Sequence, residues 1–351
     1  MQINWIWWQT MKLKKVEELE GGERLAKPIL LDIGTVLIYE DTVLKKDYIE
    51  KLVELGIEEV YIREEKESDK ANSTIEEQVR QEYGNKVREL LEHHIHHSNN
   101  TIGKLQDVAE KIFDEVIEQQ EVIDCVIEIH ERSADIYEHS VSVCVLSVLT
   151  ALKIGIQEAT AKEIAVGSLL HDIGMRYINT EFIDKDISEM NSNDVAEYKK
   201  HPVYGYSAVE KEEWISETAK AIILSHHECI DGTGFPLHTR NNEILRQTVA
   251  VCDAFDSMIC GIGTKRKKVH EAIEYIRYHS GTRYNKQVCD TFLEFIILYP
   301  NGTKVFLNNG KEAIVVGQNK YLKERPIIKL QENQEIIDMM KVNTIFIEKI
   351  L

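Results

Sequence analysis

Apolar residues recur with helical spacing through the middle of the chain, from about residue 101 to 298. One example is VIDCVIEIHERSADIYEHSVSVCVLSVLTALKIG, which ends at Gly155, and glycine and proline occur here mainly between such runs. Apolar positions three or four residues apart lie on one face of a helix, and that face is buried against its neighbours. We therefore predict a helical domain over residues 101–298.

Both ends of the chain show a different pattern, in which apolar and polar residues alternate. Residues 11–69 contain KPILLDIGTVLIYEDTVL, then an expected helix in DYIEKLVELGI and a strand in EEVYI, which predicts a small α/β or β-rich domain. Residues 299–351 include NGTKVFLNNGKEAIVVG, where Asn-Gly pairs separate alternating runs as in β-hairpins. Residues 70–100 are highly charged and are expected to form a helical linker. The predicted fold is mainly α, with a small N-terminal domain and a small C-terminal β extension.

Histidine and aspartate residues recur within the helical part. Imidazole and carboxylate groups without cysteine suit iron, manganese or zinc, and nickel or magnesium are also admissible. Such groups, if buried without a metal, would each cost a few kcal/mol (~2–7) in desolvation. Seven of them exceed the needs of one ion, so we predict two divalent metals, with the two oxygens of Asp172 between them. The predicted ligands are His139, His171, Asp172, His201, His226, His227 and Asp253.

Two local motifs are more specific than the residue types alone. HDIG occupies residues 171–174, and HHECIDGTGFP occupies residues 226–236. In the second motif, Gly232 and Gly234 are expected where the turn requires a positive φ. Together with His139 upstream, His201-Pro202 between the motifs and Asp253 downstream, these motifs make the chain resemble the HD-GYP phosphodiesterases over roughly residues 101–298.

This resemblance implies a helical HD-superfamily fold and a substrate. The expected substrate is a cyclic dinucleotide, chiefly cyclic di-GMP, opened to a linear dinucleotide or GMP by a hydroxide between the two metals. His171 and Asp172 would then be the catalytic residues. The resemblance also divides the ligands between the ions: His139, His171, Asp172 and Asp253 for one, and His201, His226 and His227 for the other, with Asp172 shared.

The chain departs from the family pattern at three positions. Met175 replaces the lysine of an HDIGK motif, Ile262 replaces the first arginine of a base-reading segment, and Phe235 replaces the tyrosine of GYP. A thioether donates neither charge nor hydrogen bond. The remaining expected substrate contacts are Lys265, Arg266, Arg176, Phe235 and Gly234. Two alternatives to the cyclic di-GMP hydrolase therefore stay open: a catalytically weak cyclic-dinucleotide receptor, or a hydrolase of hybrid cyclic GMP-AMP.

For two further groups of residues, a structural or solvent-exposed role is the alternative to metal binding. Asp135 lies one helical turn before His139, where three-metal relatives have glutamate, so we expect two metals and either a supporting or a solvated role for this shorter side chain. His93, His94, His96 and His97 end a polar helix and are expected in solvent, with adventitious zinc or nickel binding at most.

Composition restricts the partners and the compartment. The chain has 60 acidic and 42 basic residues, for a net charge of −18, which disfavours DNA and RNA. Six cysteines without a CxxC pair are expected as buried thiols in a reducing cytoplasm. We expect no stretch of the roughly 18 apolar residues that a membrane span requires. The opening MQINWIWWQT does not resemble a signal peptide, Met11 is a plausible start, and a homodimer is a further expectation.

Overall fold

The computed structural model describes residues 11–63, 83–91, 103–118, 134–319 and 322–351, except for residues 24, 28, 31–35, 39–41, 43 and 58. The chain separates into two compact units, Met1–Ser73 and Thr74–Leu351. The domain limits expected at residues 69, 100 and 298 stay predictions. The histidines at 93–97, His130, Cys125 and the opening MQINWIWWQT lie outside the described residues.

The first unit contains short paired strands and one α-helix, as the alternating pattern predicts. Its small core contains Leu25, Leu44, Leu52, Val60 and Ile62. The N-terminal and C-terminal strands of the unit pair antiparallel, and a second two-stranded ladder lies between them in sequence. The elements are β1 (Met11–Lys15), η2 (Val16–Glu18), β2 (Ile29–Leu30), β3 (Val36–Ile38), α1 (Lys46–Glu54) and β4 (Glu59–Arg63).

The last part of the chain is an antiparallel sheet with strand order β8-β7-β6-β5-β9. Its alternating residues, among them Val305, Leu307, Ala313 and Val315, form a separate small core. Gly310 adopts φ +80° in the turn between β5 and β6, which confirms the predicted Asn-Gly hairpin. The strands are β5 (Lys304–Leu307), β6 (Glu312–Gly317), β7 (Ile327–Leu330), β8 (Ile336–Asp338) and β9 (Ile347–Ile350).

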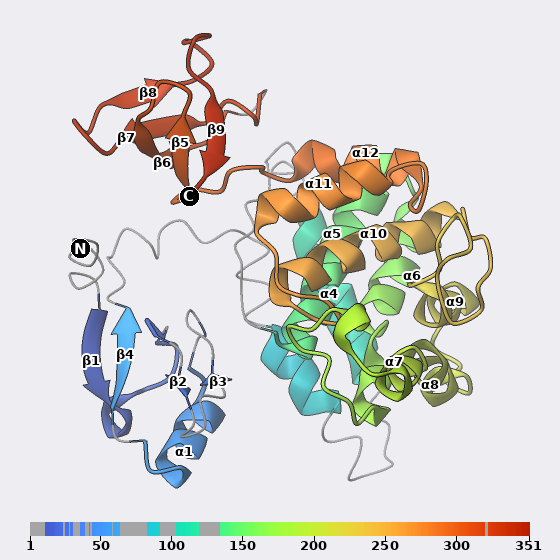
Figure 1. Ribbon diagram of the computed structural model, residues 1–351. Helices are drawn as coiled ribbons and strands as arrows, with labels where there is room; N and C mark the ends of the chain where they lie inside the picture. Colours follow the sequence, from blue (N-terminus) through green and yellow to red (C-terminus); the bar gives the residue numbers. More distant parts are fainter. Residues whose placement is uncertain are drawn as a thin grey trace. The chain divides into compact units, whose positions relative to one another are not determined.

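Helices dominate the region between these sheets, which confirms the mainly α fold (Figure 1). Several begin at a side-chain cap: Asp135, Ser216 and Asn285 each accept hydrogen bonds from the first-turn amides of the helix that follows. Residues 83–91 are also helical. The named helices are α4 (Lys104–Glu118), α5 (Ile136–Ile154), α6 (Glu158–Leu169), η4 (Ile173–Tyr177), η5 (Ile187–Glu189), α7 (Ser192–Tyr198), α8 (His201–Val209), α9 (Glu217–Ser225), α10 (Ile244–Cys260), α11 (Val269–His279) and α12 (Lys286–Phe295).

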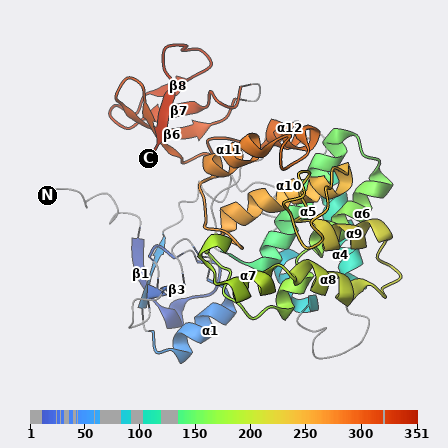
Figure 2. The ribbon, with the colours of Figure 1, turned by 45° about the vertical axis from the view of Figure 1, so that its right-hand side comes forward.

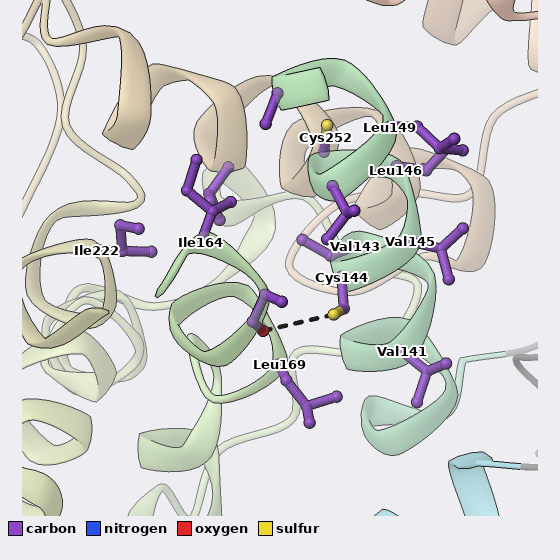
Figure 3. Close-up of a cluster of buried hydrophobic side chains, with 14 of the residues drawn as sticks. Val141, Val143, Cys144, Val145, Leu146, Leu149, Ile164, Leu169, Ile222 and Cys252 are labelled. Carbon is purple, nitrogen blue, oxygen red and sulfur yellow. Dashed lines mark hydrogen bonds between the residues drawn. The ribbon is translucent and has the colours of Figure 1, made fainter. Parts of the chain in front are cut away.

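Helix α5 is the central element of the core, and it corrects one expectation. By length and composition it could cross a membrane, so the prediction that no stretch is long and apolar enough was wrong. Every residue from His139 to Ala151 is buried, however, because α5 is enclosed by other helices. Figure 3 shows Val143 and Cys144 on the side of α5 that faces Ile164, and Val145, Leu146 and Leu149 on its other side. Cys144 donates to the carbonyl of Ala165.

The packing of these helices brings distant motifs together. Helix α5 packs against α6 and α10, α6 packs against α9, and α8 packs against both α9 and η4. Both views show α5 and α10 running side by side (Figures 1 and 2). The ends of α6 and α9, the start of α8 and the middle of α10 therefore meet near the first turn of α5.

Candidate metal centre

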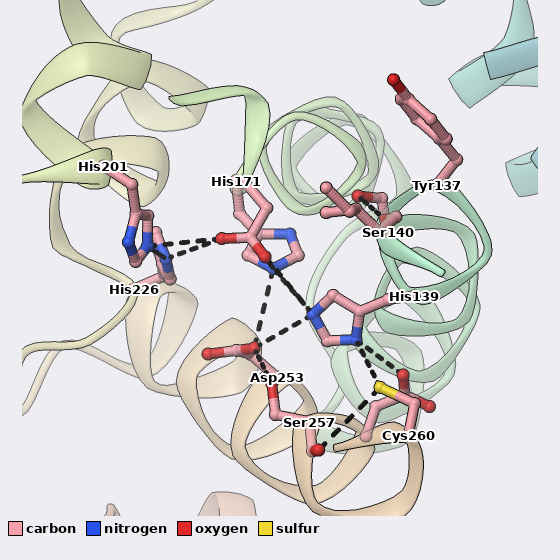
Figure 4. Close-up of polar contacts among 12 residues, drawn as sticks. Tyr137, His139, Ser140, His171, His201, His226, Asp253, Ser257 and Cys260 are labelled. Carbon is pink, nitrogen blue, oxygen red and sulfur yellow. Dashed lines mark hydrogen bonds and ion pairs between the residues drawn. The ribbon is translucent and has the colours of Figure 1, made fainter. Parts of the chain in front are cut away.

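Seven histidine and aspartate side chains converge where these helices meet. Figure 4 labels His139, His171, His201, His226 and Asp253 among them. They come from the first turn of α5, the turn after α6, the start of α8, the end of α9 and the middle of α10. All are buried except His227, whose side chain is 19% exposed. They form two groups that could each hold a metal ion: His139, His171 and Asp253, and Asp172, His201, His226 and His227. The structure thus brings together every side chain that the sequence proposed as a ligand.

Asp172 faces both groups, with one carboxylate oxygen toward each. Its Oδ2 lies 3.7 Å from His139 Nε2 and 3.6 Å from His171 Nε2. Its Oδ1 lies 3.3 Å from His201 Nε2 and 3.6 Å from His226 Nε2. This is the arrangement that a carboxylate between two cations requires.

Asp253 also spans the two groups, which the sequence did not indicate. Its Oδ1 lies 3.3 Å from His139 Nε2 and 3.6 Å from His171 Nε2. Its Oδ2 lies 3.4 Å from Nδ1 of His227, a member of the other group. Two carboxylates therefore connect the groups.

Backbone carbonyls fix the orientation of three histidines. Nδ1 of His171, His201 and His226 lies 2.7, 2.8 and 2.9 Å from the carbonyl oxygen three residues earlier, at Ser168, Tyr198 and Ile223. A carbonyl oxygen only accepts, so each Nδ1 carries the proton and donates it. The Nε2 atoms are then free of protons in the neutral rings and point their lone pairs into the centre.

The donor set fits metal ions. His139 Nε2 lies 3.2 Å from His171 Nε2, and His201 Nε2 lies 3.1 Å from His226 Nε2. In the pair of His201 and His226, each ring donates its Nδ1 proton to a carbonyl, and two unprotonated Nε2 atoms this close repel each other unless a cation lies between them. Two metal–nitrogen bonds of about 2.1 Å at angles of about 90° to 110° hold their nitrogens roughly 3.0 to 3.4 Å apart, which matches both pairs.

Burial and mutual charge perturb these groups in opposite directions. Burial lowers the pKa of His201 to about 4 and that of His227 well below its usual value, so both rings are neutral, as ligands must be. Burial alone would raise the pKa of Asp172, but the nearby charge of His171 outweighs it and holds this pKa below its usual range. Asp172 and Asp253, whose pKa values are both lowered, are thus ionised, as metal ligands must be.

His139 has a different support, a buried carboxylate that the sequence reasoning missed. Its Nδ1 donates to Asp256 Oδ2 at 2.7 Å, and Asp256 is fully buried. Cys260 Sγ lies 3.9 Å from the same nitrogen. Burial lowers the pKa of His139, but hydrogen bonds to Asp253 and Asp256 raise it well above its usual value. Asp256 follows Asp253 by three residues in CDAFD, so helical spacing was the signal that could have found it.

The loop after α9 is held by a second buried carboxylate that the sequence reasoning did not single out. Glu228 accepts the backbone N–H groups of Leu237, His238 and Thr239 at 2.6, 3.1 and 3.0 Å. It therefore anchors the GFP segment, whose Phe235 ring stacks on His227 with centroids 4.4 Å apart.

The two glycines of this loop serve different purposes. Gly232 has φ +81°, as expected. The prediction of a positive φ at Gly234 is wrong, because the backbone of that residue is not in the left-handed region. Gly234 is needed instead for close approach: a Cβ there would lie 2.3 Å from the carbonyl oxygen of His227.

The expected substrate contacts have varied surroundings. Phe235 and Gly234 adjoin the His227 group. Lys265 forms an ion pair with Glu189 at the surface, and the backbone N–H of Arg266 donates to Asp184 Oδ1 at 2.8 Å. No hydrogen bond, ion pair or cation–π contact joins Arg176 to the described residues of either group. These assignments stay predictions.

Asp135 is neither solvated nor part of the candidate centre. Its Oδ1 accepts the N–H groups of Tyr137 and Glu138 at 3.1 and 3.2 Å, and its Oδ2 pairs with Arg88. This N-cap role explains the residue.

The chain is similar to a described protein family and to several known proteins. Residues 125–288 match the family described as HD domain. The cyclic di-GMP phosphodiesterase of Pseudomonas aeruginosa is 26% identical over 216 residues, covering 61% of this chain and 52% of that protein. That of Thermotoga maritima is 30% identical over 198 residues, covering 54% of this chain and 53% of that protein. The 3'3'-cGAMP-specific phosphodiesterase 2 of Vibrio cholerae is 25% identical over 170 residues, covering 47% of this chain and 32% of that protein.

The chain thus spans about half the length of the first two relatives. Among solved structures, Bd1817, an HDG"Y"P protein from Bdellovibrio bacteriovorus, has a TM-score of 0.52 and 20% identity, and the match covers 80% of this chain and 98% of that one. This similarity concerns the fold. Residues 125–288 of this chain are therefore similar to the HD domain family, and the fold is similar to that of Bd1817.

Proposed function

We propose that this protein is a metal-dependent phosphodiesterase that hydrolyses a cyclic dinucleotide, with cyclic di-GMP as the first candidate substrate. The observation that carries the proposal is Asp172, whose two oxygens face two separate groups of histidines. The names of the relatives support the choice of substrate.

The chain's own residues would bind and orient the metals. His139, His171 and Asp253 would hold one divalent ion, iron or manganese first, and His201, His226 and His227 the other, with Asp172 shared. Metals bound in this way lower the pKa of water and stabilise negative charge on a phosphodiester. The carbonyls behind three of the rings and Asp256 behind His139 keep the Nε2 atoms directed inward. Because His227 is the exposed member, a substrate would approach from its side, beside Phe235.

A receptor without turnover is the second candidate, and one observation favours it. Met175 and Ile262, at positions where the family pattern has cationic residues, are each 2% exposed and share one apolar cluster with Phe235. Neither can contact a phosphate through a charge. Hybrid cyclic GMP-AMP is a further candidate substrate, because one relative is named for it.

A combined metal and turnover assay tests these proposals. The protein is purified anaerobically, loaded with iron or manganese, and its metal content per chain is measured. Cyclic di-GMP and 3'3'-cGAMP are then followed by chromatography. We expect about two metals per chain and a linear product, both lost in Asp172→Ala and kept in the surface control Asp290→Asn. Full occupancy with binding but no product from either substrate would favour the receptor, and absence of metal binding would refute both proposals.

The proposal also includes a cellular compartment and an oligomeric state. The five cysteines in the described part of the chain are unpaired and buried, which supports a reducing compartment such as the cytoplasm. A homodimer stays a prediction, which light scattering can check.

A further inference from the structure

We propose that Lys199 supplies the cationic phosphate contact that Met175 does not. This inference rests on the proposed function and identifies a substrate-binding residue for the same centre. Lys199 directly follows α7 and lies two residues before His201, so the backbone that carries a candidate ligand also carries this cation.

Lys199 is linked to the centre through one aromatic ring. Its Nζ lies 5.6 Å from the centroid of the Phe235 ring. That ring stacks on His227 with centroids 4.4 Å apart and planes inclined by 30°. The ammonium is therefore at most about 10 Å from the centroid of His227, the exposed candidate ligand. A substrate that reaches the metals from this side would pass within reach of a flexible lysine.

The charge of Lys199 is available for a ligand. Its neighbour Lys200 pairs with Glu197 at 2.9 Å, and Lys265 pairs with Glu189. Across the described ranges, no carboxylate pairs with Lys199, whose contact is with the face of Phe235. A cation–π contact at a partly exposed site is worth only about 0.5–1 kcal/mol, so the ammonium can leave the ring for a phosphate at little cost.

Met175 cannot take this role because of where its side chain lies. It is 2% exposed and packs in the cluster that contains Phe182, Tyr198, Phe235 and Ile262. Met175 and Ile262, the two positions where the family pattern has cationic residues, both lie in this apolar cluster. With a net charge of −18 on the chain, an anionic substrate needs a local cation besides the metals, and among the described residues Lys199 is the cation that contacts a residue stacked on the centre.

The test compares adjacent lysines. Lys199→Met removes the charge at similar length, Lys199→Arg keeps it, and Lys200→Met is the matched control. Each protein is loaded with manganese, its metal content is measured, and inorganic phosphate is titrated by calorimetry. We expect phosphate affinity to fall roughly tenfold in Lys199→Met, as for loss of a charge-assisted contact, and to stay within about twofold in the other two. Metal content should not change.

Several results would overturn the proposal. These are unchanged phosphate affinity in Lys199→Met, an equal loss in Lys200→Met, loss of metal along with the charge, or no phosphate binding by the loaded wild type. Turnover of cyclic di-GMP adds an independent measurement, in which KM should rise about tenfold in Lys199→Met and recover in Lys199→Arg. If the wild type binds phosphate but hydrolyses neither cyclic dinucleotide, the proposed enzyme activity fails, while the titration still decides the role of Lys199.

Discussion

Replacing Asp256 by asparagine should weaken metal binding without removing any candidate ligand. Asp256 accepts the Nδ1 proton of His139 at 2.7 Å, and both side chains are fully buried. An ionised acceptor makes the imidazole a better donor at Nε2 and fixes the ring plane. Asparagine keeps the shape but loses the charge, and its amide group can present a competing donor to Nδ1.

The size of the effect follows from this geometry. A short, charge-assisted hydrogen bond to a metal-binding histidine is worth about 10- to 100-fold in metal affinity, or roughly 1.4 to 2.7 kcal/mol. The other three oriented histidines have neutral carbonyl partners at 2.7 to 2.9 Å and are unaffected. We therefore expect the loss in the group that contains His139, with weaker binding at one of the two ions.

Competition with a chelating dye measures this affinity directly for manganese or zinc. Asp290→Asn, on the surface of α12, is the matched control, and circular dichroism checks that the fold is kept. A folded Asp256→Asn protein that binds both ions as tightly as the wild type would refute the reasoning. Equal weakening at both ions would also contradict it, because Asp256 contacts one group.

Three other predictions follow from the same centre. Metal removal with a chelator should lower the thermal midpoint, since saturation at 100 times Kd stabilises the fold by about 2.7 kcal/mol per ion; an unchanged calorimetric scan would contradict it. Glu228→Gln should cost about 2 to 3 kcal/mol in urea unfolding because its two carboxylate oxygens accept three backbone amides and glutamine replaces one of these oxygens with a donor; an unchanged midpoint would show that the anchor is dispensable. Gly174→Ala should cost about 3 kcal/mol, because its Cβ would lie 1.9 Å from the carbonyl oxygen of His201; Gly317→Ala, with room for a Cβ, is the control, and equal unfolding midpoints for the two variants would contradict the argument.

The helical fold was predictable because local signals and burial agree. Helix α5 has an aspartate cap at its start and Gly155 in the left-handed region at its end, and its residues from His139 to Ala151 are all buried. The composition of α5 is also why the prediction about membrane spans was wrong, since an enclosed core helix and a membrane span have similar compositions. Only the packing of α5 against α6 and α10 distinguishes them.

The candidate ligands were predictable from residue type and motif, whereas their supports were not. Asp256 and Glu228 are carboxylates in a chain with 60 acidic residues; the helical spacing of Asp256 from Asp253 is a weak signal, and the local sequence of Glu228 does not separate it from solvated carboxylates. What distinguishes them is the partner each meets: the ring of His139 for one, and three amides of a loop for the other. Such partners are fixed by tertiary packing.

The lysines before His201 show this limit most clearly. Lys199 and Lys200 are adjacent and identical in type, so the sequence gives no reason to prefer either. On a helix end, adjacent residues point about 100° apart, and this rotation carries Lys200 to Glu197 and Lys199 to the ring beside the centre. A cation missing from a motif can therefore be replaced by one that only the fold brings near. The loss at Met175 is thus a weak argument against catalysis until the charge at Lys199 has been removed.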